Sequence, residues 1–258
     1  MKTLISILAL TFLMASCSQN NVTEDDSLKQ YFDAAGVTGT FGMFDNGQGH
    51  FTIYNLKRFR DAYLPAQTFD IIQSLVGIQT GVVKDDSTDV LGLSLHRAFQ
   101  ADGDSNRAVF KELADRIGKD TLKKWIDSLS YGNKDISSAI DTFWLDNHLT
   151  ITSDEQLGLV KRLYFDQLPF FPRSQKIVRQ MMLMEGNSNY QLSYKTGTGI
   201  RKDGHLLTWI TGWVEENKHP YFFVMNLDVA DTNKSLKDNG LGVLRQILQK
   251  MGFFQGKK

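Results

Sequence analysis

Residues 63–72 read Tyr-Leu-Pro-Ala-Gln-Thr-Phe-Asp-Ile-Ile, and this stretch decides how the chain folds and what its site can do. Pro65 suits the first turn of a helix and Gly81 suits the position after its end, so a helix is predicted between them. Gln67 and Asp70 lie three residues apart and therefore share one face of that helix. Any chemistry on this face must use a carboxamide and a carboxylate.

Strand patterns stand on both sides of this helix. The apolar, β-branched and aromatic runs at 37–44 and 50–54 are separated by Asp-Asn-Gly-Gln-Gly, which predicts a β-hairpin. Further strands are predicted at 190–196, 206–215 and 221–227, the last two joined by the turn sequence Asn-Lys-His-Pro.

The middle of the chain has helical periodicity. Helices are predicted at 105–130 with a break near Gly118, at 152–164, at 174–184, and finally at 234–251. Strands at both chain ends with helices between them predict an α/β (α+β) fold. Its core is one antiparallel sheet assembled from both ends, flanked by helices, with an inserted helical subdomain.

Composition excludes several function classes. The 258 residues are 41% hydrophobic and 22% charged with a net charge of zero, which suits one globular domain without a field attracting nucleic acid. The five histidines are scattered and never at metal-ligand spacing, so no metal site and no cofactor are predicted. No nucleic-acid partner is expected.

The N-terminus predicts export. Lys2 precedes an apolar stretch at 4–14 that is too short to span a bilayer, and Met-Ala-Ser-Cys17 follows it. This resembles a lipobox, whose cysteine is lipidated; the alternative is an ordinary signal peptide with an incidental cysteine. The predicted organisation is a signal segment at 1–17, a polar tether at 18–30 and one domain at 31–258.

Several blocks along the chain carry a family resemblance. They are Tyr131-Gly132-Asn133, Asp141-Thr-Phe-Trp144-Leu, Lys195-Thr196-Gly197-Thr198-Gly199, and the strand sequences after them. In this order and at these spacings they resemble the class D β-lactamases (oxacillinases), which are penicillin-recognising serine hydrolases. The resemblance implies a β-lactamase/DD-peptidase-like fold with its active site between the sheet and the helical subdomain.

The resemblance also exposes two departures in the opening stretch. The family carries Pro-Ala-Ser-Thr-Phe-Lys there, with Ser as nucleophile and a carboxylated Lys as general base. Gln67 stands at the Ser position and Asp70 at the Lys position. One expectation is that the Asp70 carboxylate imitates the lysine carbamate beside Trp144. The alternative is that Gln67 and Asp70 are inactive remnants that hydrogen-bond to each other or to nearby backbone. Thr68, turned about 100° from Gln67, is expected to face the core.

The family's Ser-x-Val motif maps to Ser105-Asn106-Arg107. The resemblance makes Ser105 the candidate proton shuttle. Arg107 replaces an apolar residue, and it is expected either to pair with Asp70 or to point to solvent.

The ligand-holding side of the family site is retained. The resemblance places Lys195, Thr196, Gly197 and Thr198 on the strand that lines the pocket, and it makes the backbone N–H groups of Gln67 and Thr198 oxyanion donors. Arg245, in Gly240-Leu-Gly-Val-Leu-Arg245-Gln, resembles the family's carboxylate-binding arginine, and the planar fork of an arginine suits a carboxylate. The alternative for Arg245 is a surface charge on a helix.

Three functions are compatible with this pattern. The first is a lipid-anchored protein of the bacterial envelope, in the periplasm or outer membrane, that binds β-lactams or peptidoglycan stem peptides without serine acylation. The second is a β-lactamase working by a non-standard route, in which Asp70 activates water. The third is a partner-binding scaffold with an inactive pocket, since a fold does not dictate a function.

Overall fold

The structure, a computed structural model, describes residues 21–101, 103–232 and 236–258. The predicted signal segment and its lipidation residue Cys17 lie outside the described residues. Within the described ranges, no helix is both long enough and apolar enough to cross a membrane.

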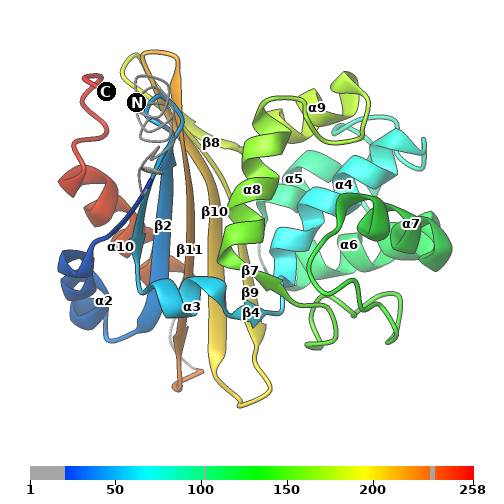
Figure 1. The fold of residues 1–258 in the computed structure, drawn as a ribbon. Coiled ribbons are helices and arrows are strands. Elements are labelled where there is room, and N and C mark those ends of the chain that lie inside the picture. The colour runs from blue at the N-terminus through cyan, green and yellow to red at the C-terminus, as the bar shows by residue number, and fades with distance from the viewer. Residues whose placement is uncertain (1–20, 102, 233–235) are drawn as a thin grey trace, which may run out of the picture.

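A mixed sheet forms the centre of the molecule (Figure 1). In the described residues it has seven strands in the order β1-β3-β2-β11-β10-β9-β8. Their bounds are β1 Val22–Glu24, β2 Thr38–Asp45, β3 His50–Tyr54, β8 Leu183–Gly186, β9 Gln191–Ile200, β10 Leu206–Glu216 and β11 His219–Val229. The central pairing of β2 with β11 joins the two chain ends, so the predicted sheet assembly is confirmed.

The beginning of the domain differs from the prediction in two ways. β1 pairs parallel with β3, so the sheet is mixed and not antiparallel throughout. The predicted tether at 18–30 is also too long, because β1 and the start of α2 (Lys29–Ala35) are already part of the domain. The strand was missed because its sequence is polar. A strand at the edge of a sheet can be polar, since one of its faces remains in water.

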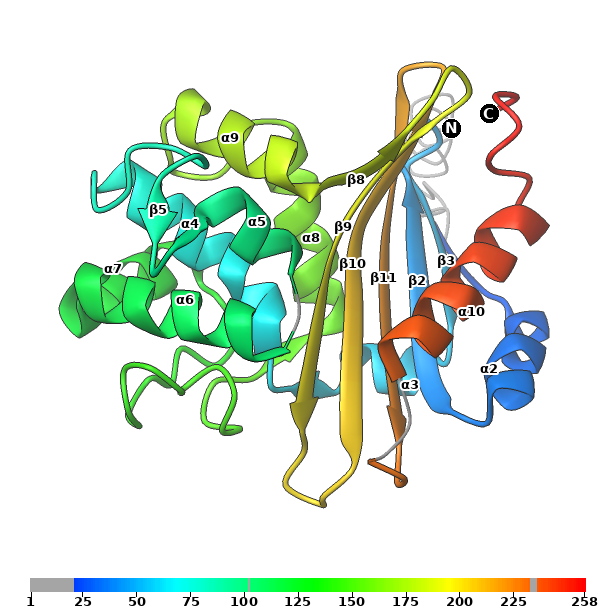
Figure 2. The same cartoon turned by 180° about the vertical axis from the view of Figure 1, so that it is seen from behind.

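Helices cover both faces of the sheet, as the two opposite views show (Figures 1 and 2). α2 and α10 pack on one face, and α8 packs on the other beside the helical subdomain. Besides α2, the principal helices are α4 Asp70–Gln79, α5 Leu95–Gln100, α6 Gly103–Ile117, α7 Lys119–Leu129, α8 Ser153–Tyr164, α9 Pro172–Met182 and α10 Leu236–Lys250. Short elements are the 3₁₀ helices η2 Asp26–Leu28 and η3 Ala66–Phe69, α3 Leu56–Arg60, and the two-residue strands β4 Ala62–Tyr63, β5 Asp89–Val90, β6 Leu93–Ser94 and β7 Ile151–Thr152.

Local signals set several of these boundaries. The predicted break at Gly118 is confirmed: its φ of 84° ends α6 and lets α7 begin. Thr152 and Glu155 form a capping box at the start of α8. The helix predicted after Pro65 is confirmed, although its first turn is the 3₁₀ helix η3.

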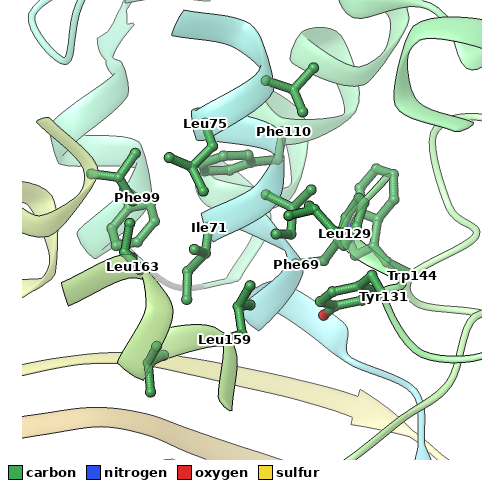
Figure 3. Packing of buried hydrophobic residues seen from close by; sticks show 14 of the residues in the cluster. Phe69, Ile71, Leu75, Phe99, Phe110, Leu129, Tyr131, Trp144, Leu159 and Leu163 are labelled. Carbon is green, nitrogen blue, oxygen red and sulfur yellow. The ribbon is translucent and has the colours of Figure 1, made fainter. Parts of the chain in front are cut away.

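Helix α4 is the buried axis of the helical subdomain. Every residue from Asp70 to Ile78 is buried. Figure 3 shows Ile71 and Leu75 of this helix amid side chains from other segments, including Phe99 and Phe110. A helix surrounded on all sides by protein is expected to be apolar all round. The polar residues that α4 does carry therefore need partners inside the protein.

Two glycines give a matched test of this packing. A Cβ at Gly212 of β10 would lie 2.0 Å from the backbone oxygen of Ser193, whereas a Cβ at Gly158 of α8 would meet no atom within 4 Å. Gly212→Ala should therefore destabilise the protein by about 1–3 kcal/mol. Gly158→Ala should stabilise it by about 0.5–1 kcal/mol, because alanine favours a helix. Urea unfolding measures both, and equal effects would contradict the packing described here.

Candidate functional site

The site lies where η3 meets the edge of β9. β9 pairs with β10 along its length, but in the described sheet β8 pairs only with its first residues, Gln191–Ser193. η3 packs against the remaining edge, and a Cβ at Gly197 would lie 2.7 Å from the Thr68 nitrogen and 2.9 Å from the Gln67 nitrogen. Only glycine permits this approach.

Gln67 closes this junction with a hydrogen bond to the sheet edge. Its Oε1 accepts from the backbone N–H of Thr198 at 2.6 Å. The side chain is 8% exposed and forms part of the surface of a cleft. Gln67 thus bonds to backbone, and the expected bond between Gln67 and Asp70 is not formed in the described structure.

Asp70 forms a buried ion pair with Lys195. Its Oδ2 lies 2.8 Å from Lys195 Nζ and accepts a second bond, also 2.8 Å, from Asn106 Nδ2. Lys195 Nζ also donates to the backbone oxygen of Phe99 at 2.5 Å. Lys195 is 3% exposed and Asp70 is fully buried, so neither charge reaches solvent.

Burial and charge act in opposite directions on Asp70. Burial is the largest effect and raises the pKa of its carboxyl group. The positive charge of Lys195 and the hydrogen bonds from Lys195 and Asn106 lower the pKa and partly offset this rise. In the described part of the chain, Asp70 Oδ1 has no hydrogen-bond partner. The pair therefore depends on Lys195, because an isolated buried carboxylate is strongly unfavourable.

Helix α6 presents a different residue to the site from the one predicted. Ser105 is exposed, while Asn106 is buried and also donates to the backbone oxygen of Ala98 at 2.9 Å. The expected pair between Arg107 and Asp70 is wrong: Arg107 is half exposed and lies 3.5 Å from Asp104. The reason is geometric, since residue 106 faces α4 and its neighbours at 105 and 107 turn outward.

Helical spacing could have found Asn106. It precedes Val109, Phe110 and Leu113 by three, four and seven residues, which places it on the buried face of α6. A lone polar residue on an apolar helix face signals a buried polar partner.

Thr68 faces inward, as predicted. Its Oγ1 donates to the backbone oxygen of Pro65 at 2.6 Å and accepts from Gln156 Nε2 at 2.6 Å. Trp144 is buried and stacks on Phe69 at 5.7 Å between ring centroids. The backbone oxygen of Trp144 accepts from the N–H of Ala66 at 3.0 Å, so this segment positions η3.

Arg245 takes part in a different contact. It forms an ion pair with Glu185 and lies over the ring of Phe254. Among the described residues that line the cleft, Arg245 does not occur. Its guanidinium is therefore held beside β8, which carries Glu185.

The cleft itself has a volume of about 330 Å³. Its walls are Gln67, Gly103, Arg107, Gly197, Thr198, Lys237 and Asp238. Asp70 and Lys195 are buried beneath this surface. The described residues contain no group of three or more His, Cys, Asp or Glu side chains that could hold a metal ion. The cleft offers amide, hydroxyl and charged groups to a ligand.

Comparison with known proteins agrees with this architecture. Residues 18–249 match the family model of the penicillin-binding protein transpeptidase domain. This match gives the general class of protein to which the chain belongs. β-Lactamase OXA-48 of Klebsiella pneumoniae is 37% identical over 225 residues, which cover 80% of this chain and 78% of that protein. The chain therefore belongs to the class D β-lactamase family.

Solved structures show the same fold. The class D β-lactamase FUS-1 (OXA-85) of Fusobacterium nucleatum subsp. polymorphum superposes with a TM-score of 0.81 at 29% identity, covering 90% of this chain and all of that one (100%). The C-terminal domain of the BlaR penicillin receptor of Bacillus licheniformis superposes with a TM-score of 0.83 at 26% identity, covering 92% of this chain and 98% of that one.

The buried pair generates a double-variant test. Asp70→Ala leaves Lys195 charged, buried and unpaired, so unfolding free energy should fall by about 3–5 kcal/mol. Adding Lys195→Met removes the remaining charge and should restore most of this loss. Urea unfolding of the wild type, both single variants and the double variant measures the coupling. Losses that simply add would show that the two groups do not interact.

Proposed function

We propose that this chain is a penicillin-recognising protein that binds β-lactams or peptidoglycan stem peptides reversibly, without serine acylation. The observation that carries the proposal is the environment of Gln67 and Asp70. Gln67 bonds the sheet edge beside the cleft, and Asp70 is locked to Lys195 below it. By the family resemblance these are the positions of the nucleophile and the general base.

Neither residue supplies the expected chemistry. A glutamine carboxamide has no hydroxyl to attack a carbonyl, and its oxygen is already engaged by Thr198. An aspartate has no amine that could be carboxylated. Ser105, the candidate proton shuttle, is on the exposed side of α6. Acylation requires a nucleophile within reach of a base, and this pair of positions has neither.

Binding groups nevertheless surround the cleft. The Thr198 N–H, which donates to Gln67 in this structure, would donate to a ligand carbonyl oxygen that replaces Gln67, and the side chains of Arg107 and Lys237 are cations on the cleft wall. A ligand with an amide carbonyl and a carboxylate matches this set, which describes both β-lactams and the ends of peptide stems. That the same fold serves the BlaR penicillin receptor as well as β-lactamases supports a recognition role.

Intact-protein mass and thermal unfolding test this proposal together. After incubation of residues 18–258 with benzylpenicillin, the mass should stay unchanged while millimolar drug raises the unfolding temperature, because binding is reversible. A class D β-lactamase treated in parallel is the control for acylation.

Other outcomes select the alternatives. A mass increase equal to the drug would overturn the proposal and reveal a nucleophile. Turnover of a chromogenic cephalosporin that disappears in Asp70→Ala would establish a β-lactamase using a non-standard route. No mass change, no thermal shift and no turnover would favour a partner-binding scaffold.

We also propose that the protein is exported and anchored in the bacterial envelope through a lipid on Cys17. The support is the short apolar stretch before Met-Ala-Ser-Cys17 and the fact that this is the chain's single cysteine. A lipid on this residue would hold the domain at a membrane surface, in the periplasm or at the outer membrane.

Metabolic labelling tests the anchor. In a bacterial host, the full chain should incorporate radiolabelled palmitate and fractionate with membranes. Cys17→Ser should lose the label and leave the membrane fraction, because the acceptor thiol is absent. Labelling that survives Cys17→Ser, or a wild-type chain without label, would contradict lipidation at this residue.

A further inference from the structure

The hydrogen bond at Thr198 is set by sheet geometry. Thr198 lies opposite Thr208 of β10, yet its N–H points to Gln67 on the other side of β9. In an antiparallel ladder, alternate residues of an edge strand direct their N–H and C=O groups away from the neighbour. Beyond Ser193, the described part of β8 does not pair with β9, so the outward N–H of Thr198 must find another acceptor.

Gln67 provides that acceptor from inside the chain. Its Oε1 lies 2.6 Å from the Thr198 nitrogen, a short distance for an N–H···O bond. The backbone beneath cannot shift easily, because Gly197 already lies in close contact with the nitrogens of Gln67 and Thr68. The side chain, by contrast, forms part of the wall of the cleft of about 330 Å³, so the cleft is the space next to it.

The carboxamide of Gln67 is also the chemical analogue of a ligand group. It offers an amide oxygen to the sheet-edge N–H, as the carbonyl of a lactam or peptide would. It is neutral, it is tethered, and it needs no ordering of a free molecule, which favours it over a dilute ligand.

We infer that Gln67 is an internal competitor for the ligand, occupying the Thr198 N–H in the free protein and yielding it when a carbonyl-bearing anion enters the cleft. This inference rests on the proposed function. Gln67 then sets specificity: a ligand must hold a strong carbonyl acceptor at Thr198 and gain enough from the charged wall to displace the carboxamide.

Two variants separate the roles of the side chain. Gln67→Met keeps a flexible side chain of similar length but removes the acceptor. Gln67→Ala removes the acceptor and the bulk. Gln249→Ala, on the exposed surface of α10, is the matched control. Each protein is examined by NMR hydrogen exchange at the Thr198 amide and by titration with benzylpenicillin.

The two readouts answer different questions. Loss of one neutral hydrogen bond should accelerate Thr198 amide exchange in both Gln67 variants by roughly threefold to tenfold, with no change in Gln249→Ala. If the competitor is removed, benzylpenicillin should bind both variants more tightly than wild type by a similar factor, and its binding should slow the exchange again.

Contrary results are distinguishable. Unchanged Thr198 exchange in both variants would overturn the inference whether or not the drug binds. Faster exchange with equal drug affinity in wild type and variants would overturn the competition. Faster exchange with no drug binding by any protein would overturn the proposed function, and with it the competition, while leaving the Gln67–Thr198 bond established.

Discussion

The ion pair between Asp70 and Lys195 is the constraint on which the site depends. It joins α4, the buried axis of the helical subdomain, to β9 of the sheet, across 2.8 Å and without contact with water. Two charges removed from water must be paired and hydrogen-bonded, so the positions of both elements are coupled. Asn106 and the Phe99 backbone complete the polar shell. A displaced α4 would therefore leave a charge buried and alone.

This pairing also explains the character of the cleft. Lys195 forms its ion pair with Asp70 beneath the surface, and Gln67 accepts the hydrogen bond from Thr198 at the surface. The wall of the cleft also carries the charged side chains of Arg107, Lys237 and Asp238, together with Gly197 and Thr198. Polar and charged groups therefore dominate this surface.

Much of the fold was accessible from local pattern. The hairpin around residues 45–49, the break at Gly118 and the helix that begins near Thr152 each depend on neighbours a few residues apart, and each was predicted. The parallel edge strand β1 was missed, because pairing with β3 depends on residues distant in the chain and its polar sequence resembled a tether.

The candidate site divides in the same way. The family resemblance singled out Gln67, Asp70 and the Lys195–Thr198 strand as candidate site residues, because the motifs that carry the resemblance are short stretches of sequence. Which ion pairs form was decided only by the folded chain. Asp70 pairs with Lys195 and not with Arg107, and Arg245 pairs with Glu185. The physical reason is that burial and orientation decide which of several possible ion pairs forms, and both arise from contacts between segments far apart in the sequence.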